Sequence, residues 1–210
     1  TAANQVEAAI VKGLSKFKVS EDNILSGSKV GPTIARDTSI RSTYAIALAI
    51  IGMFLYILIR FRNVGFSLGA TAALFHDVLI VFSLYSILWG IVPFELSIDQ
   101  AFIAAILTVV GYSINDTVVV FDRVREFLGD NKRETNVGPI INKAINTTLS
   151  RTLITSLTTL LVILILFIAG GEGLKGFTFA LLVGVAVGTY SSVCIATPVV
   201  VDFMKRFNKD

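Results

Sequence analysis

Charged side chains that interrupt apolar stretches are the residues of this sequence best suited to chemistry. Asn115 and Asp116 lie inside an apolar run that begins near Ala101, and Asp77 and Arg151 interrupt two other runs. A charge at the centre of a bilayer costs roughly 2.5–3.5 kcal/mol on insertion scales, so it usually faces a hydrated path or a partner of opposite charge. The pattern therefore predicts proton transfer or ion pairing inside a membrane.

Asp116 and Arg151 form the most specific candidate pair. Hydroxyl side chains recur around Arg151 at spacings of three and four residues, which puts them on one helix face. These are Thr148, Thr152, Thr155 and Thr159. Arginine keeps its charge, so the group that titrates would be Asp116, paired with Arg151 or protonated when the helices separate. The alternative is an ion pair that only holds two helices together.

Three polar neighbours join this candidate site. His76 precedes Asp77, and histidine titrates near physiological pH, so a proton role is one interpretation and a polar residue near the inner interface is the other. Tyr112 lies one helical turn before Asp116, where its hydroxyl either bonds the carboxylate or only packs. We expect Asp116, Arg151 and Asp77 to relay protons. The supporting polar residues are Asn115, Tyr112, Thr148, Thr152, Thr155 and His76.

Composition indicates an integral membrane protein. Of the 210 residues, 54% are hydrophobic and 16% are charged, against about 25% charged in soluble domains, and the mean hydropathy is +0.76. The net charge of +3 does not indicate nucleic-acid binding, because the basic residues lie mainly at the ends of apolar runs. The sequence contains no P-loop, no Gly-x-Ser-x-Gly elbow and no Cys/His metal spacing. We therefore expect a transport component rather than an enzyme, with neither metal nor cofactor.

Five apolar segments are long enough to cross a bilayer, and lipid leaves helices as the expected spanning structure. They cover about 42–59, 64–92, 97–121, 139–169 and 174–204. Small residues at spacings of four predict close helix packing. These are Gly65, Gly69 and Ala73 in the second segment and Gly184 and Gly188 in the fifth.

Basic residues fix the expected orientation. They follow the first, third and fifth segments: Arg60, Arg62, Arg123, Arg125, Lys132, Arg133, Lys143, Lys205, Arg206 and Lys209. The positive-inside rule then makes the C-terminus cytoplasmic and residues 1–41 extracytoplasmic. Counted from the outer ends of their segments at about 1.5 Å per residue, Asp77, Asp116 and Arg151 fall in nearly one layer, roughly 23–27 Å below the outer surface.

Residues 1–41 are polar in character. Val6, Ile10, Leu14 and Phe17 recur at helical spacing, and Ile24 to Val30 reads as a short strand. So short a segment cannot bury a core of its own. We expect a partial α+β segment, the C-terminal part of a larger periplasmic domain, in a chain that opens inside a longer protein.

Four motifs resemble the SecF family, including the SecF half of fused SecDF proteins. They are VGPT at 30–33, FHDV at 75–78, GYSINDTVVVFDRVRE at 111–126 and NTTLSRT at 146–152. The resemblance covers essentially the whole chain, and the third motif is highly specific. It implies an RND-type half with six spanning helices, of which the first would be missing here. It also implies that Asp116 and Arg151 match the intramembrane Asp and Arg of the family.

The resemblance implies an auxiliary subunit of the Sec translocase in the bacterial cytoplasmic membrane. Such a subunit uses the proton gradient to draw polypeptide out on the periplasmic side. The implied partners are SecD, the translocon channel, unfolded exported polypeptide, protons and lipid. Two alternatives stay open: a structural or assembly subunit whose buried charges only register helices, and an RND-type small-molecule exporter.

Overall fold

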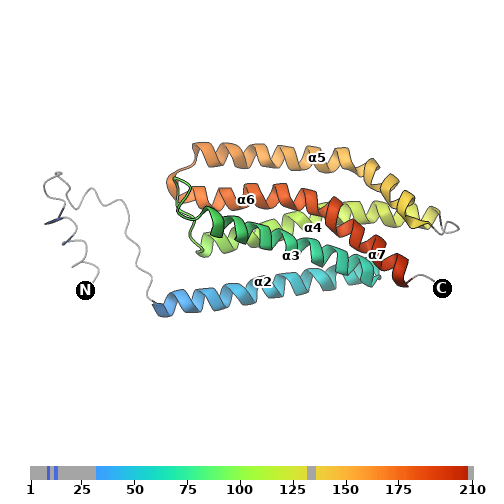
Figure 1. The fold of residues 1–210 in the computed structure, drawn as a ribbon, viewed down its shortest axis with the longest axis horizontal. Helices are drawn as coiled ribbons and strands as arrows, with labels where there is room; N and C mark the ends of the chain where they lie inside the picture. The colour runs from blue at the N-terminus through green and yellow to red at the C-terminus, as the bar shows by residue number, and fades with distance from the viewer. Residues whose placement is uncertain (1–8, 10–11, 14–31, 132–135, 208–210) are drawn as a thin grey trace. The chain divides into compact units, whose positions relative to one another are not determined.

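The computed structural model describes residues 9, 12–13, 32–131 and 136–207 (Figure 1). The chain divides into two compact units, Thr1–Arg41 and Ser42–Asp210, and the second unit holds the candidate site. The helix and strand predicted within the first 41 residues lie almost entirely outside the described residues.

Most of the described residues between 32 and 207 are helical. They are α2 (Pro32–Phe61), α3 (Val64–Leu88), α4 (Gln100–Asp130), α5 (Val137–Ala169), α6 (Glu172–Ser191) and α7 (Thr197–Phe207), with a π-helical segment, η3 (Ser192–Ala196), between α6 and α7. Five stretches are long and apolar enough to cross a membrane, and the fifth comprises α6, η3 and most of α7. The expected all-α membrane bundle of five spanning helices is therefore confirmed.

Side-chain caps begin the helices that follow two of the connections. The Asn63 side chain accepts a hydrogen bond from the Gly65 amide (2.8 Å) and so caps the first turn of α3. Asp99 does the same for α4 by accepting from the Phe102 amide (2.9 Å). Both caps satisfy amides that have no partner within their own helix.

Two helices differ from the segments that hydropathy predicts. The third segment was expected to end near Phe121, but α4 continues to Asp130. Its added turns are charged, and Arg123 pairs with Glu126 one turn later (2.6 Å), so they stay helical beyond the apolar run. In the fifth segment a π-helix interrupts an expected regular helix. Hydropathy follows where lipid contact ends, not where helical hydrogen bonding ends.

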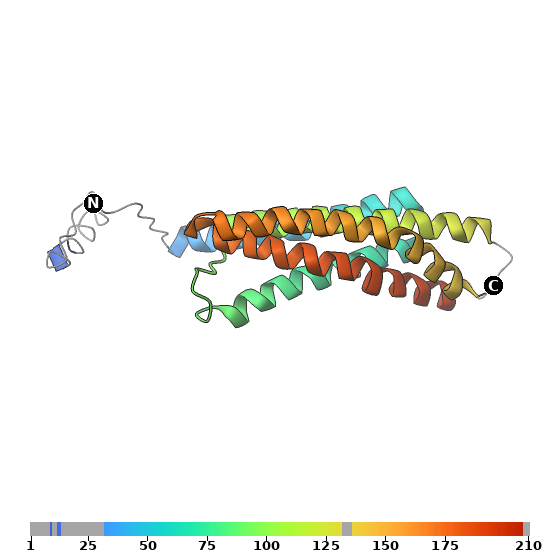
Figure 2. The same cartoon turned by 90° about the horizontal axis from the view of Figure 1, so that it is seen from above.

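The bundle is built around α4 and α6. Half of the residues in the apolar window of α4 are buried, against 6% for α2. Helix α6 contacts α3, α4 and α5, and α4 in turn contacts α3 and α5. Figure 1 shows α2 and α5 at opposite edges of this arrangement, and Figure 2 shows the same helices turned by 90°. Side chains at the α4–α6 contact are therefore the best shielded from lipid.

Glycines allow these helices to approach closely, as the small-residue spacing predicts. A Cβ at Gly184 on α6 would overlap the side chain of Val109 on α4, and one at Gly69 on α3 would lie 2.5 Å from the backbone oxygen of Ala196. Gly65, in the first turn of α3, faces the ring of Phe203 on α7. Close backbone approach gives van der Waals packing, which stabilises helix association in lipid.

An exposed ion pair links α2 to α4. One Arg60 nitrogen lies 2.9 Å from both carboxylate oxygens of Asp122, and both side chains are about two-fifths exposed. Exposed pairs typically contribute 0.2–1 kcal/mol. We expect Asp122→Asn to lower the unfolding free energy by less than about 1 kcal/mol. Thermal melting of the detergent-purified protein, with Arg60→Gln and the double variant completing the cycle, measures this; a coupling above about 2 kcal/mol would show that the pair is desolvated.

Candidate functional site

Asp116 lies on α4 and is 5% exposed. The Ser156 hydroxyl on α5 donates to Asp116 Oδ2 at 3.2 Å. Thr189 Oγ1 on α6 lies 2.7 Å from the same Ser156 oxygen. The carboxylate is therefore held at the junction of three helices by a chain of hydroxyls.

Arg151 does not form the ion pair that the sequence predicts. Its side chain is exposed, and the ion pairs found within 4.0 Å in the described part of the chain do not include one between Arg151 and Asp116. The buried row of α5 is Thr148, Thr152 and Ser156, spaced by four residues, and Arg151 lies one residue off that row, about 100° around the helix.

Only some of the hydroxyl side chains predicted to share one face of this helix lie on its buried face. Thr148 and Thr152 belong to the buried row, whereas Thr155 is exposed and its hydroxyl bonds to the backbone oxygens of Arg151 and Thr152. The hydroxyl of Thr152 is buried and has no hydrogen-bond partner among the residues that the structure describes. A buried unpaired hydroxyl costs free energy, so this position is available to a water or to another partner.

Tyr112 and Asn115 do not contact the Asp116 carboxylate. The Tyr112 hydroxyl donates to Thr159 Oγ1 on α5 at 3.2 Å, so the contact with Asp116 considered above is not made. Asn115 is exposed on the surface of α4. Successive helical residues point about 100° apart, and with Asp116 turned inward its neighbour is turned away.

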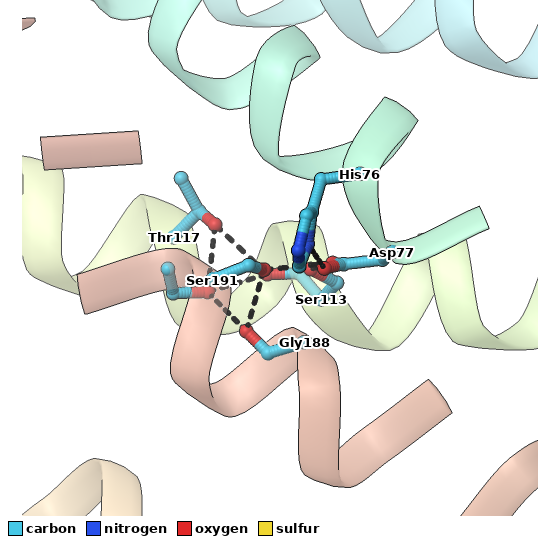
Figure 3. A network of polar contacts seen from close by, with 7 residues as sticks. His76, Asp77, Ser113, Thr117, Gly188 and Ser191 are labelled. Carbon is cyan, nitrogen blue, oxygen red and sulfur yellow. Dashed lines mark hydrogen bonds and ion pairs between the residues drawn. The ribbon is translucent and has the colours of Figure 1, made fainter. Parts of the chain in front are cut away.

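Asp77 occupies a second buried polar site, drawn in Figure 3. Its side chain is 1% exposed. The hydroxyls of Ser113 on α4 and Ser191 on α6 donate to Asp77 Oδ2 at 2.7 and 2.8 Å. His76 Nδ1 lies 3.2 Å from the other oxygen, Oδ1, and the His76 side chain is 32% exposed. Asp77 therefore ties α3 to both central helices.

Serines of the last helix complete this second site. Ser192 begins η3, and its Oγ lies 2.9 Å from Thr117 Oγ1 and 2.8 Å from the backbone oxygen of Gly188. Sequence reasoning missed Ser113, Thr117, Ser156, Thr189, Ser191 and Ser192. The polar run Thr189–Ser192 inside an apolar segment could have indicated some of these residues. A hydroxyl costs less free energy in lipid than a charge does, so it is a weaker sign of a functional site.

The two carboxylates lie at one level of the bundle. Ser113, which bonds Asp77, is one turn before Asp116 on α4, and Thr189 is two residues before Ser191 on α6. Among the described residues there is no group of three or more His, Cys, Asp or Glu side chains that could hold a metal ion. The site offers two buried carboxylates, one histidine and hydroxyls, a set suited to binding and transferring protons.

Comparisons with known proteins identify the family. Residues 10–206 match the family described as "Protein export membrane protein SecD/SecF, C-terminal". The chain is 52% identical over 204 residues to the protein translocase subunit SecF of Rhodothermus marinus, covering 97% of this chain and 66% of the relative. It is 43% identical over 197 residues to SecF of Thermodesulfovibrio yellowstonii, covering 93% and 63%.

A solved structure shows the same family relationship. The crystal structure of SecDF from Thermus thermophilus, described as a translocon-associated membrane protein, superposes with a TM-score of 0.75 at 42% identity, over 84% of this chain and 24% of that one. The chain spans just under two thirds of the length of the SecF relatives named above. It is a multi-pass membrane protein that belongs to the SecD/SecF family of protein-export membrane proteins, on the SecF side of that family.

Proposed function

We propose that the chain is the membrane part of an accessory subunit of the Sec protein translocase, which uses the proton gradient to promote protein export across the bacterial cytoplasmic membrane. The names of its relatives support the translocase role. The observation that carries the proton coupling is Asp116, a carboxylate buried between three helices and bonded there by one hydroxyl. Buried ionisable residues in membrane helices are by default functional.

The proposed mechanism is an exchange of partners at Asp116. In one state, the one described above, Ser156 bonds the carboxylate and Arg151 lies outside. In the other, a turn of α5 brings the guanidinium to the ionised carboxylate. A proton arriving at Asp116 removes its charge, and with it the attraction for the guanidinium, and so favours the first state, in which Ser156 bonds Asp116. A charge change that biases two packings of the same helices is sufficient to drive a movement.

The proposed orientation puts the C-terminus and the charged end of α4 in the cytoplasm. Arg60, Arg123 and Arg125 lie at that end, consistent with the positive-inside rule. Residues 1–41 would then be periplasmic, where the emerging polypeptide is held and released. The proposed partners are a SecD half or subunit, the translocon channel and the exported polypeptide.

Gradient-dependent export tests this proposal without any substitution. Membrane vesicles that carry the full SecD–SecF unit are compared with vesicles that lack it, each with and without a protonophore. We expect the unit to accelerate export, and the protonophore to remove that acceleration alone. Acceleration that persists after the gradient has collapsed would contradict proton coupling.

The second candidate function is that of a structural subunit. The hydrogen bonds from hydroxyls to both carboxylates would also fix the register of the helices against one another. Asp116→Asn separates the two functions, because asparagine still accepts from Ser156 and so keeps the hydroxyl bonding, but it cannot titrate. A relay does not survive the loss of its titrating carboxylate at position 116, so we expect gradient-dependent export to stay at the level of vesicles without the unit. Normal export by an Asp116→Asn protein present at wild-type amounts would instead support the structural subunit.

A further inference from the structure

Asp77 is the buried charged group that the proposed exchange at Asp116 does not use. It accepts hydrogen bonds from two hydroxyls, and His76 faces its second oxygen. Hydrogen bonds to an ionised acceptor are roughly twice as strong as neutral ones. This carboxylate therefore connects α3 to both α4 and α6 through hydrogen bonds.

Its bonding partners sit beside those of Asp116. On α4, Ser113 bonds Asp77 and lies one turn before Asp116. On α6, Ser191 bonds Asp77 and lies two residues after Thr189, whose hydroxyl contacts Ser156. Both central helices thus carry one residue of each network. A change in how Asp77 holds α6 against α4 must move the hydroxyl chain that reaches Asp116.

The last spanning helix changes its winding at this point and packs closely on its neighbours. Directly after Ser191 it widens into η3, and π-turns inside α-helices are rare and frequently occur at functional sites. Gly188, one turn before Ser192, has no side chain, and a Cβ there would lie 3.0 Å from Ser113 Cβ and 3.5 Å from Asp77 Oδ2. The fit of α6 on α4 is therefore tight and is determined by the same residues that bond Asp77.

We propose that Asp77, with His76, is a positioning residue of the proton site: it sets the register of α6 against α4 and so presents Thr189 and Ser156 to Asp116. This role rests on the proposed function and concerns how the proton site at Asp116 is regulated. His76 is the one titratable side chain that contacts Asp77 among the described residues; from α4 and α6 the groups facing it are the hydroxyls of Ser113 and Ser191. Removal of the Asp77 carboxylate or of its His76 partner weakens the tie and alters the bonding of Asp116.

The test reads the protonation of Asp116 directly. In the purified full SecD–SecF unit in liposomes, infrared difference spectra with Asp116→Asn identify the carboxyl band of Asp116, which is then followed against pH. We expect Asp77→Asn to displace the midpoint of that titration by about one pH unit, a tenfold change in proton affinity, and to reduce gradient-dependent export. The control is Ser67→Ala, a buried serine of α3 whose hydroxyl bonds the backbone oxygen of Asn63 within the described part of the chain, and it should change neither.

Each outcome decides the matter. Reduced export with an unmoved Asp116 midpoint would make Asp77 merely structural and overturn the inference, as would two unchanged readouts. If Asp77→Asn does not accumulate, Ser191→Ala removes a single donor and should displace the midpoint in the same sense as Ser113→Ala; an unmoved midpoint in both again overturns it. Normal export by Asp116→Asn would refute the proposed function instead, and the displacement caused at Asp77 would still be measurable.

Discussion

Asp116→Asn is expected to reduce gradient-dependent export to the level of membranes without the unit, while the protein inserts and accumulates normally. Asparagine keeps the shape of the side chain and can still accept from Ser156, but it cannot bind and release a proton. Positioned proton-transfer groups typically contribute 10²–10⁴-fold to the rates they serve, so we expect a loss of at least about tenfold in the gradient-dependent rate.

The measurement compares export rates in vesicles with matched amounts of each variant. Asp122→Asn is the control, since it makes the same change on the same helix at an exposed position paired with Arg60. It should export at the wild-type rate. Wild-type export by Asp116→Asn would exclude Asp116 from the proton path and shift attention to the structural alternative.

The second large effect is expected at Gly184. Any side chain there meets Val109 across the contact between α4 and α6, and both residues are buried. Overpacking a filled core costs typically 1–3 kcal/mol and occasionally more. We expect Gly184→Leu to separate the two central helices and to cause loss of most of the folded protein from membranes.

The milder Gly184→Ala makes the effect measurable. It should lower the melting temperature of the detergent-solubilised protein, and Val109→Ala on the facing helix should restore part of the loss by removing the obstructing methyl groups. Gly52→Leu is the control, because a Cβ at Gly52 meets no atom within 4 Å. Equal destabilisation by both leucines would show that helix propensity or lipid contact, not packing against Val109, decides the outcome.

The membrane bundle could be predicted from the sequence because its determinants are local. Runs of apolar residues fix the spans, and the spacing of Gly65, Gly69, Gly184 and Gly188 correctly indicates which faces pack. The ends of α4 and the π-turn of η3 could not be predicted, since both depend on hydrogen bonding and contacts that hydropathy does not describe.

The buried carboxylates of the candidate site could be predicted from the sequence, but the hydrogen bonds that they make could not. Asp77 and Asp116 interrupt apolar runs and are buried, as such residues tend to be. Which face of α5 meets α4 is a tertiary matter, and the structure turns Thr152 and Ser156 inward in place of Arg151. Arg151 is adjacent to Thr152 in the sequence, so a difference of one residue in which face of α5 points inward replaces the expected ion pair by a chain of hydroxyls.

The wide turn at η3 also determines how the last spanning helix keeps contact with α3 on both sides of the turn. Before η3, Ser191 faces Asp77 of α3; at its last residue and beyond it, Ala196 and Val200 face Gly69 of the same helix. A π-turn accommodates more residues per turn than an α-turn, so it resets the angular phase between the two halves. An uninterrupted α-helix of the same length would keep one of these contacts and turn the residues that make the other away from α3. The π-helical segment therefore changes the direction in which the residues after it point. The fold depends on the number of residues in this segment as much as on their identities.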